Sequence, residues 1–151
     1  MAEAKVLSGA GLRGQVAGQT ALSTVGQAGA GLTYRGYDVR ELAADAQFEE
    51  VAYLLLYGEL PGKTELAAYS AKLSTLRDLP RALKEVLERI PADAHPMDVM
   101  RTGCSFLGNI EPEKDFSAQH DVTDRLLAAF PAIMCYWNRP RPSLGASTGR
   151  P

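Results

Sequence analysis

The sequence has few of the residues from which metal and redox sites are built. It contains two cysteines and two histidines, and neither Cys104 nor Cys135 stands in a CxxC pattern or at a Cys/His ligand spacing. Isolated cysteines of this kind are typical of small buried apolar side chains. We therefore expect no metal site, and we expect both cysteines to be core residues.

The sequence also lacks a long apolar run and an excess of one charge. No window approaches the roughly 20 apolar residues that span a membrane, and residues 1–5 do not begin the basic and then apolar stretch of an export signal. The 16 basic and 18 acidic residues are scattered and leave a net charge of −2. This balance gives no electrostatic reason to expect a nucleic acid or a membrane as partner. Because the sequence shows neither an export signal nor a membrane span, we expect a cytoplasmic protein.

Glycine and short β-like segments mark the first part of the chain. Residues 10–19 are too rich in glycine for a helix, and we expect an arm over 1–20. The segments 21–25 and 32–35 flank a glycine-rich loop, 26–31, which is the pattern of a short β-hairpin. A dinucleotide-binding glycine loop would need a helix directly after it, so the pattern does not predict a Rossmann fold.

The chain changes character at a tyrosine-rich turn. Tyr34 and Tyr37 favour an extended ribbon, and Gly36 allows the backbone to turn. Asp38 can then cap a helix by accepting a hydrogen bond from its first turn. Arg35, between the two tyrosines, is a candidate for a chemical role, although an arginine that packs on a ring or stays in water is the more common case.

From Asp38 onward the hydrophobic spacing has the period of amphipathic helices. Gly58 and Pro61 end the second helix, Thr64 is expected to cap the third, and Pro80 leads the fourth. The spacing predicts six helices with short loops, which can bury one another's apolar faces in antiparallel succession. Their apolar residues span 39–43, 48–56, 66–76, 83–90, 99–107 and 122–137.

Four segments stand in the order and spacing of one enzyme family. They are 34–38 (Tyr-Arg-Gly-Tyr-Asp), 48–55 (Phe-Glu-Glu-Val-Ala-Tyr-Leu-Leu), 58–61 (Gly-Glu-Leu-Pro) and 95–103 (His-Pro-Met-Asp-Val-Met-Arg-Thr-Gly). Together they resemble the amino-terminal part of citrate synthases, and the resemblance covers nearly everything from Leu12 to Trp137. The last segment and residues 21–25 look most like the 2-methylcitrate synthase branch.

The resemblance implies an all-α, citrate-synthase-like multi-helical fold, here its amino-terminal portion, with a short β-hairpin near the N-terminus. On this interpretation the chain divides into an arm (1–20), part of the large helical domain (21–137) and a tail (138–151). The implied activity is that of an acyltransferase that joins propionyl-CoA, or acetyl-CoA in the citrate branch, to oxaloacetate and hydrolyses the thioester. The CoA thioester is then a substrate, no cofactor is expected, and a homodimer is implied.

Catalysis in the family, as the resemblance implies, uses a carboxylate base and two histidines that stabilise developing charge on oxygen. Those residues lie further along the family pattern than this chain extends, so no residue is assigned a catalytic role. His95 matches a residue that opens a structural helix, and His120 lies in a predicted polar linker. We expect the chain alone to be inactive.

The last residues depart from the family pattern. From 138 to 151 the sequence turns to proline, glycine, serine and arginine, and Pro140 and Pro142 forbid a continuing helix. A frameshift or a premature stop in the reading frame is the interpretation we favour. A native basic tail is the alternative.

Two residues of the chain are candidates for substrate binding by the resemblance. Arg13 stands where related citrate synthases place an arginine that reaches a CoA phosphate, and a guanidinium suits phosphate because its charge is permanent and its donors are forked. Lys72 stands where methylcitrate synthases place a substrate contact, and a solvated helix lysine is the alternative. Arg101 and Arg125 are expected to be structural or exposed.

A second class of function stays open beside the enzyme. A non-catalytic helical module could bind a partner subunit, such as a full-length synthase, through apolar faces that its own helices leave uncovered. An unstable remnant without a role is a third possibility. Turnover by the purified chain separates the enzyme from the other two.

Overall fold

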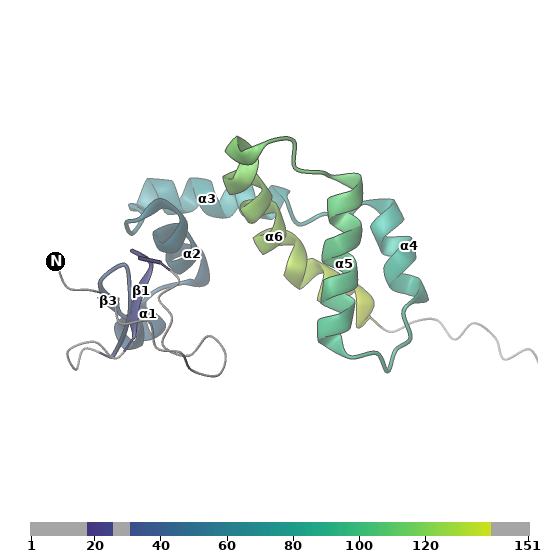
Figure 1. Cartoon of the computed structure of the whole chain (residues 1–151), viewed down its shortest axis with the longest axis horizontal. Coiled ribbons are helices and arrows are strands. Elements are labelled where there is room, and N and C mark those ends of the chain that lie inside the picture. The colour runs from purple at the N-terminus through teal and green to yellow at the C-terminus, as the bar shows by residue number, and fades with distance from the viewer. Residues whose placement is uncertain (1–17, 26–30, 140–151) are drawn as a thin grey trace, which may run out of the picture. The chain divides into compact units, whose positions relative to one another are not determined.

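The computed structural model describes residues 18–25 and 31–139. The chain divides into two compact units, Met1–Leu60 and Pro61–Pro151, and Figure 1 labels the α-helices of both. Most of the arm and of the tail predicted for the two ends lies outside the described residues, and so does Arg13.

The first unit begins with a small antiparallel sheet in which β2 is the central strand. Thr33 of β2 stands opposite Thr24 of β1, and the predicted hairpin is therefore confirmed. The third strand extends the sheet beyond that prediction. The strands are β1 (Ser23–Val25), β2 (Leu32–Tyr34) and β3 (Tyr37–Asp38).

A two-residue turn joins β2 to β3. Arg35 (φ 49°) and Gly36 (φ 92°) both lie in the left-handed region, which suits the twist of a tight hairpin. Glycine adopts this conformation without steric cost, whereas a side chain such as that of arginine does so less readily. The turn predicted at Gly36 is confirmed.

Two short helices complete the first unit, α1 (Val39–Asp45) and α2 (Phe48–Tyr57). Asp38 caps α1 as predicted, because its Oδ1 accepts a hydrogen bond from the Arg40 amide at 2.7 Å. Gly58 ends α2 in the left-handed conformation with φ at 100°, which confirms the predicted end of this helix.

The second unit is built from longer helices, so the fold as a whole is mostly helical with a small sheet, as predicted. The elements are α3 (Lys63–Thr75), α4 (Arg81–Arg89), α5 (Pro96–Ile110), the 3-10 turn η2 (Phe116–Ala118) and α6 (Gln119–Trp137).

The start of α3 differs from its prediction. Thr64 does not cap this helix, because α3 begins at Lys63 and Gly62 precedes it. The Gly62 amide donates to Oε2 of Glu65 at 2.8 Å, so a glutamate in the first turn reaches back to the residue before the helix. Pro80 directly precedes α4, as predicted.

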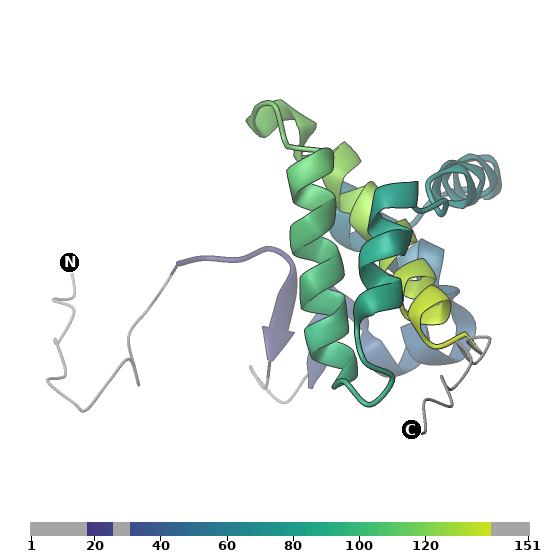
Figure 2. The same cartoon turned by 90° about the vertical axis from the view of Figure 1, so that its right-hand side faces the viewer.

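The helices α4, α5 and α6 pack around one apolar core. Figure 2 shows α4 and α5 side by side, with α6 passing behind them. Leu83, Leu87, Val99 and Ile133 have no exposed surface. At Gly103 an added Cβ would lie only 2.9 Å from Cγ2 of Ile133, so the absence of a side chain lets α5 and α6 approach closely. The apolar faces predicted from the sequence thus form the core.

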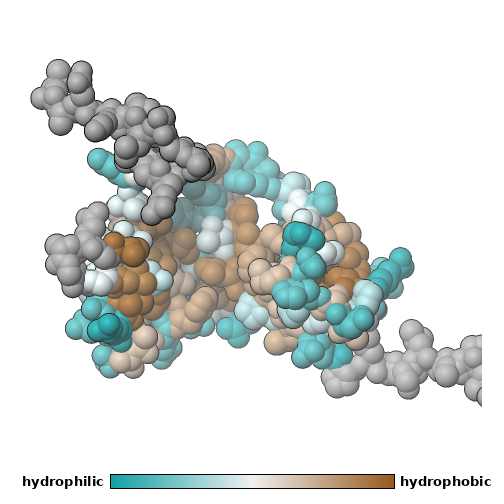
Figure 3. Space-filling view, turned by 60° about the horizontal axis from the view of Figure 1, so that its bottom comes forward, coloured by the Kyte–Doolittle hydropathy of each residue, from teal (hydrophilic) through white to brown (hydrophobic). Residues whose placement is uncertain are grey.

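Large hydrophobic side chains also reach the surface of both units. Phe48 is 63% exposed in the first unit, and Met97 and Phe116 are 68% and 80% exposed in the second. Figure 3 shows hydrophobic surface among hydrophilic patches. Within the described ranges, no helix has both the length and the apolar character needed to cross a membrane.

Candidate functional site

Lys72, the predicted substrate-binding residue that the structure describes, connects α3 to α6. Its Nζ donates hydrogen bonds to Oδ2 of Asp124 at 2.7 Å and to Oδ1 of Asp121 at 2.9 Å. The bond to Asp124, followed by that to Asp121, raises the pKa of Lys72 above its ordinary value, and the same ammonium lowers the pKa of Asp121. Lys72 is therefore a charged and paired lysine.

Asp124 is a buried carboxylate on α6. It has no exposed surface, and its other oxygen, Oδ1, accepts a hydrogen bond from the hydroxyl of Tyr69 at 2.8 Å. An isolated carboxylate in the interior is costly, so the charge depends on both partners. We call Tyr69, Lys72, Asp121 and Asp124 the α3–α6 ion cluster.

The α3–α6 ion cluster follows from residue spacing on two helices. Tyr69 and Lys72 are three residues apart on α3, and Asp121 and Asp124 are three apart on α6, which places each pair on one side of its helix. The side chain of Asp121 is 81% exposed and that of Asp124 is 0% exposed. The cluster therefore has a buried inner end and an outer end in water.

Sequence reasoning found Lys72 but missed the other members of this cluster. The usable signal was in α6, where Asp124 stands four residues before Ala128 and both are buried. An acidic residue within an apolar stripe indicates a buried charge that needs a partner. The partner Lys72 lies 52 positions away along the chain, a separation that helical periodicity does not reveal.

Arg125, the next residue on α6, holds three segments together. Its Nε and Nη2 donate to the two carboxylate oxygens of Glu111 at 2.8 and 2.9 Å, and its Nη1 donates to the carbonyls of Leu76 and Asp78. This is the bidentate geometry in which a guanidinium binds a carboxylate best. The structural role predicted for Arg125 is confirmed, and Arg101 is exposed, as expected.

A pocket of about 500 Å³ opens beside Arg125. Leucine and valine side chains from α5 and α6 line its wall, and Glu113 and Asp121 carry charge into it. Because Arg125 is engaged by Glu111, its positive charge is already balanced. The pocket therefore suits an apolar group better than a free anion.

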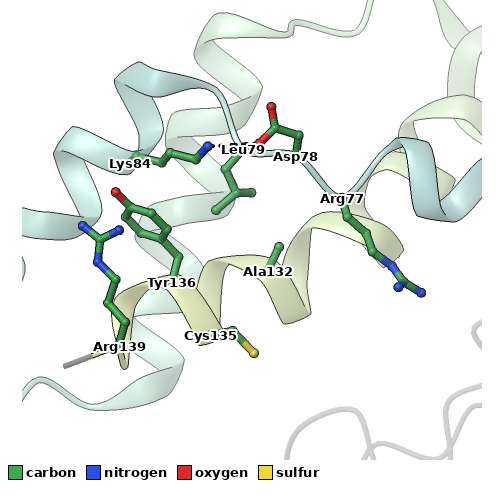
Figure 4. Close-up of a pocket in the computed structure, with 8 residues that line it drawn as sticks. All are labelled: Arg77, Asp78, Leu79, Lys84, Ala132, Cys135, Tyr136 and Arg139. Carbon is green, nitrogen blue, oxygen red and sulfur yellow. Dashed lines mark hydrogen bonds and ion pairs between the residues drawn. The ribbon is translucent and has the colours of Figure 1, made fainter.

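A second pocket, of about 440 Å³, is lined by residues of α4, α6 and the segment before α4 (Figure 4). The guanidinium of Arg139 lies 3.7 Å from the centre of the Tyr136 ring, a cation–π contact. The Tyr136 hydroxyl donates to Oε1 of Glu88 at 2.6 Å, and this bond raises the pKa of Tyr136. We call Glu88, Tyr136 and Arg139 the α4–α6 surface cluster.

The basic residues of this second pocket do not converge on one point. Arg139 pairs with Glu88, and Nζ of Lys84 pairs with Oδ1 of Asp78 at 3.0 Å, which lowers the pKa of Asp78. Figure 4 shows Arg77 pointing away from both pairs. Since Arg139 and Lys84 are already paired with carboxylates, we interpret this region as a surface connection between helices and not as an anion site.

Both histidines lie at helix starts. Nδ1 of His95 accepts a hydrogen bond from the Met97 amide at 3.2 Å and caps α5, which confirms its predicted place at the helix entry. His120 lies in the first turn of α6, so its placement in a linker was wrong. The first turn of α6 is polar, so apolar spacing alone did not indicate that the helix begins there.

The cysteines only partly match their predicted burial. Cys104 is half-buried, whereas Cys135 is exposed, so the prediction of a core residue is wrong for Cys135. Ile133 and Trp137, two residues before and after it, are buried, and a residue between them points to the opposite side of the helix. No three potential ligands among the described residues lie close enough to hold a metal ion.

Arg35 is the remaining candidate, in the first unit. Its Nη2 donates to the carbonyl of Leu55 at 3.0 Å, near the C-terminal end of α2, where a positive charge suits the helix dipole. Its Nε is buried and makes no hydrogen bond within the described part of the chain. Arg35 thus connects the hairpin turn to α2. The sequence suggested either a chemical role or an arginine that packs on a ring or stays in water, and neither included this contact.

Comparison with known proteins gives one consistent result. A sequence profile described as "Citrate synthase, C-terminal domain" matches residues 11–148. The 2-methylcitrate synthase of Shewanella oneidensis is 72% identical over 139 residues, which cover 92% of this chain and 37% of that protein.

Solved structures agree with the sequence match. The citrate synthase of Thermotoga maritima has a TM-score of 0.73 and 30% identity, over 85% of this chain and 33% of that one. The citrate synthase of Thermoplasma acidophilum, solved as a ternary complex with carboxymethyl coenzyme A and oxaloacetate, has a TM-score of 0.77 and 25% identity, over 89% of this chain and 38% of that one. The chain thus spans little more than a third of the length of such proteins, and its amino-terminal placement within them stays a prediction.

Proposed function

Because the chain belongs to the citrate synthase family, we propose that it forms part of an acyl-CoA condensing enzyme of the 2-methylcitrate synthase type. The enzyme would join the α-carbon of propionyl-CoA to the ketone of oxaloacetate and then hydrolyse the thioester, with acetyl-CoA as the alternative acyl donor. The observation that carries this proposal is the 72% identity with a 2-methylcitrate synthase over 139 residues.

The proposed substrates have support from a related structure. The citrate synthase of Thermoplasma acidophilum was solved with carboxymethyl coenzyme A and oxaloacetate, which are a CoA derivative and the keto acid of the proposed reaction. Within this chain we assign Lys72 to a substrate carboxylate and Arg13 to a CoA phosphate on the family resemblance, because a positively charged side chain suits each of these anions.

We assign no catalytic residue within this chain. Nδ1 of His95 is used in capping α5, and the carboxylate of Asp124 is held by Tyr69 and Lys72. The chain would therefore supply scaffold and substrate contacts, and the purified chain alone would not turn over. For the assembled enzyme we propose a homodimer in the cytoplasm.

A graft tests the proposal. The matching segment of the Shewanella oneidensis enzyme is replaced by the segment from this chain, and oxaloacetate-dependent release of free thiol from propionyl-CoA is measured. We expect a rate close to that of the parent enzyme. A matched graft from the Thermotoga maritima citrate synthase, which is only 30% identical to this chain, is the control and is expected to lose most of the activity. A folded but inactive graft of this chain would contradict the proposal.

A non-catalytic module that binds a partner subunit is the second candidate. The observation that favours it is the exposure of Met97 and Phe116, at 68% and 80%, because a partner that covers either side chain would bury apolar surface. Size-exclusion chromatography of the purified chain separates the cases. A stable monomer that does not bind the full-length relative would remove this candidate.

A further inference from the structure

The pocket of about 500 Å³ lies within the second unit, between α5, α6 and the residue that follows α3. We call it the α5–α6 pocket. Its volume falls in the range of sites that hold small molecules. Its apolar wall is made by Leu76, Cys104, Leu107, Val122 and Leu126. A ligand with an apolar body would lose contact with water against this wall, which favours binding.

Among the described residues that line the α5–α6 pocket, Arg125 carries the only positive charge. Its Nε and Nη2 donate to both carboxylate oxygens of Glu111, at 2.8 and 2.9 Å, and its Nη1 donates to two backbone carbonyls. Glu111 lines the same pocket, so the two charges cancel there. An anionic ligand would have to compete with this bidentate pair.

Two further acids of the pocket leave an excess of negative charge. Glu113 is exposed and has no hydrogen-bond or ion-pair partner among the described residues. Asp121 pairs with Lys72, but the same ammonium also pairs with Asp124, so two carboxylates share one positive charge. The mouth of the pocket is therefore acidic while its wall is apolar, and a cleft with charge of one sign attracts the opposite one.

We propose that the α5–α6 pocket binds a small organic ammonium ion with an apolar body. The body lies against the leucine and valine side chains between α5 and α6, and the ammonium faces Glu113 and Asp121 at the exposed side. Burial of the body supplies most of the affinity. The exposed charges contribute less, because water screens them, and they select a cation over a neutral or anionic molecule of the same shape.

The first experiment compares three probes that share one aromatic body. They are phenethylamine, which is an ammonium ion at neutral pH, phenethyl alcohol and hydrocinnamate, and they are titrated into the full 151-residue chain. NMR shifts of backbone amides in α5 and α6 give the dissociation constants. We expect the ammonium to bind about two- to fivefold more tightly than the alcohol, the factor that a partly exposed ion pair allows, and the carboxylate to bind most weakly.

The two cysteines locate the bound probe. Cys104 lines the pocket, whereas Cys135 is exposed and lies outside it. The chain is treated with iodoacetamide, and mass spectrometry measures how fast each thiol is alkylated. We expect saturating phenethylamine to slow the reaction of Cys104 and to leave that of Cys135 unchanged.

Two substitutions test the wall and the charge separately. Gly108 lines the pocket, and a Cβ there would meet nothing within 4 Å, so Gly108→Leu is expected to fill the space and abolish the shifts. Glu113→Gln is expected to weaken binding of the ammonium about two- to fivefold and to leave binding of the alcohol unchanged. Glu85→Gln, which removes an exposed acid from α4, is the matched control and is expected to bind the ammonium like the unaltered chain.

Several results would overturn the proposal. They are equal binding of the three probes, tighter binding of the carboxylate, equal protection of both cysteines, equal effects of Glu113→Gln and Glu85→Gln, or no binding by the unaltered chain. If Gly108→Leu does not fold, as judged by circular dichroism, the comparison of Glu113→Gln with Glu85→Gln still decides. The readout is binding and not turnover, so its failure is distinct from failure of the graft.

Discussion

Two polar clusters connect α6 to other helices, and they differ chiefly in burial. The α3–α6 ion cluster places the carboxylate of Asp124 in the interior with no exposed surface. The α4–α6 surface cluster joins Glu88 to Tyr136 and Arg139, with the side chains of Glu88 and Arg139 47% and 42% exposed. In each cluster a tyrosine and a base bind the same acid, Asp124 in the first and Glu88 in the second, so the comparison shows the effect of burial on that acid.

The two clusters differ in how strongly each charged group depends on its partner. At the surface each charged group can return to water when its partner is removed, so an ion pair there stabilises the fold only slightly. In the interior a carboxylate without its partners has no such alternative, and the whole cost of desolvation appears when the pair is broken. We therefore expect matched substitutions in the two clusters to have unequal effects.

The largest expected effect comes from removing the base of each cluster. Lys72→Met leaves the buried carboxylate of Asp124 without its ammonium partner, and we expect the free energy of unfolding to fall by about 3 kcal/mol or more. Arg139→Met is the matched change and is expected to cost about 1 kcal/mol or less. Urea denaturation followed by circular dichroism measures both. Equal losses in the two variants would contradict the comparison.

Removing the tyrosine hydroxyls gives the next effect. Tyr69→Phe deprives the buried carboxylate of Asp124 of the hydrogen bond from the Tyr69 hydroxyl, and we expect the free energy of unfolding to fall by about 2 kcal/mol. Tyr136→Phe removes the bond to Glu88, whose side chain is 47% exposed and can bind water in its place. The same denaturation experiment is expected to show a clearly smaller change for Tyr136→Phe, and the reverse order would count against the account.

A pair of glycines on α5 repeats the contrast between inside and outside without any charge. An added Cβ at Gly103 would lie 2.9 Å from Ile133, whereas one at Gly108 would meet nothing within 4 Å. We expect Gly103→Ala to lower the melting temperature, at a cost of about 1 kcal/mol from overpacking. Gly108→Ala should raise the melting temperature, because the better helix propensity of alanine stabilises the fold by up to about 1 kcal/mol. Calorimetry of the two variants tests this. A stabilised Gly103→Ala would contradict the prediction, because it would show that the Ile133 side chain shifts at little cost.

The smallest effect is on the pH dependence of stability. The pKa of Asp121 is lowered from 3.8 in the folded chain, so its contribution is present above that value and is lost as the pH falls through the lowered one. The pKa of Lys72 is raised from 10.5, so its contribution is present below that value and is lost only in strong alkali. We expect Asp121→Asn to weaken the acid dependence of the urea midpoint and to leave the alkaline dependence in place. An unchanged acid dependence would contradict the assigned pair.

Local features of the fold could be predicted from the sequence, because they depend on neighbours along the chain. Asp38 and His95 were placed correctly at helix starts, and Gly58 at a helix end, since each acts on residues within one turn. Thr64 failed as a cap because α3 begins one residue before it, at Lys63, so Thr64 lies within the first turn. Cys135 failed because a residue type that is usually buried lies here on the outer side of α6.

The candidate site could be predicted only in part, because it depends on contacts between distant segments. Lys72 was found from a family resemblance, whereas Tyr69 and Asp124 gave no sign that they would meet across α3 and α6. In sequence a buried aspartate looks like an exposed one, and only the surrounding apolar stripe of α6 distinguishes it. An acid within such a stripe is the signal to look for a partner on another helix.

Oxaloacetate-dependent release of thiol from propionyl-CoA by the graft tests the central claim, that this chain supplies part of a condensing enzyme, most directly. The account predicts that the graft keeps a rate close to that of the Shewanella oneidensis parent and that the purified chain alone releases none. A correctly folded graft without activity would contradict the claim, because a segment 72% identical to its counterpart would then have lost the capacity to support the reaction.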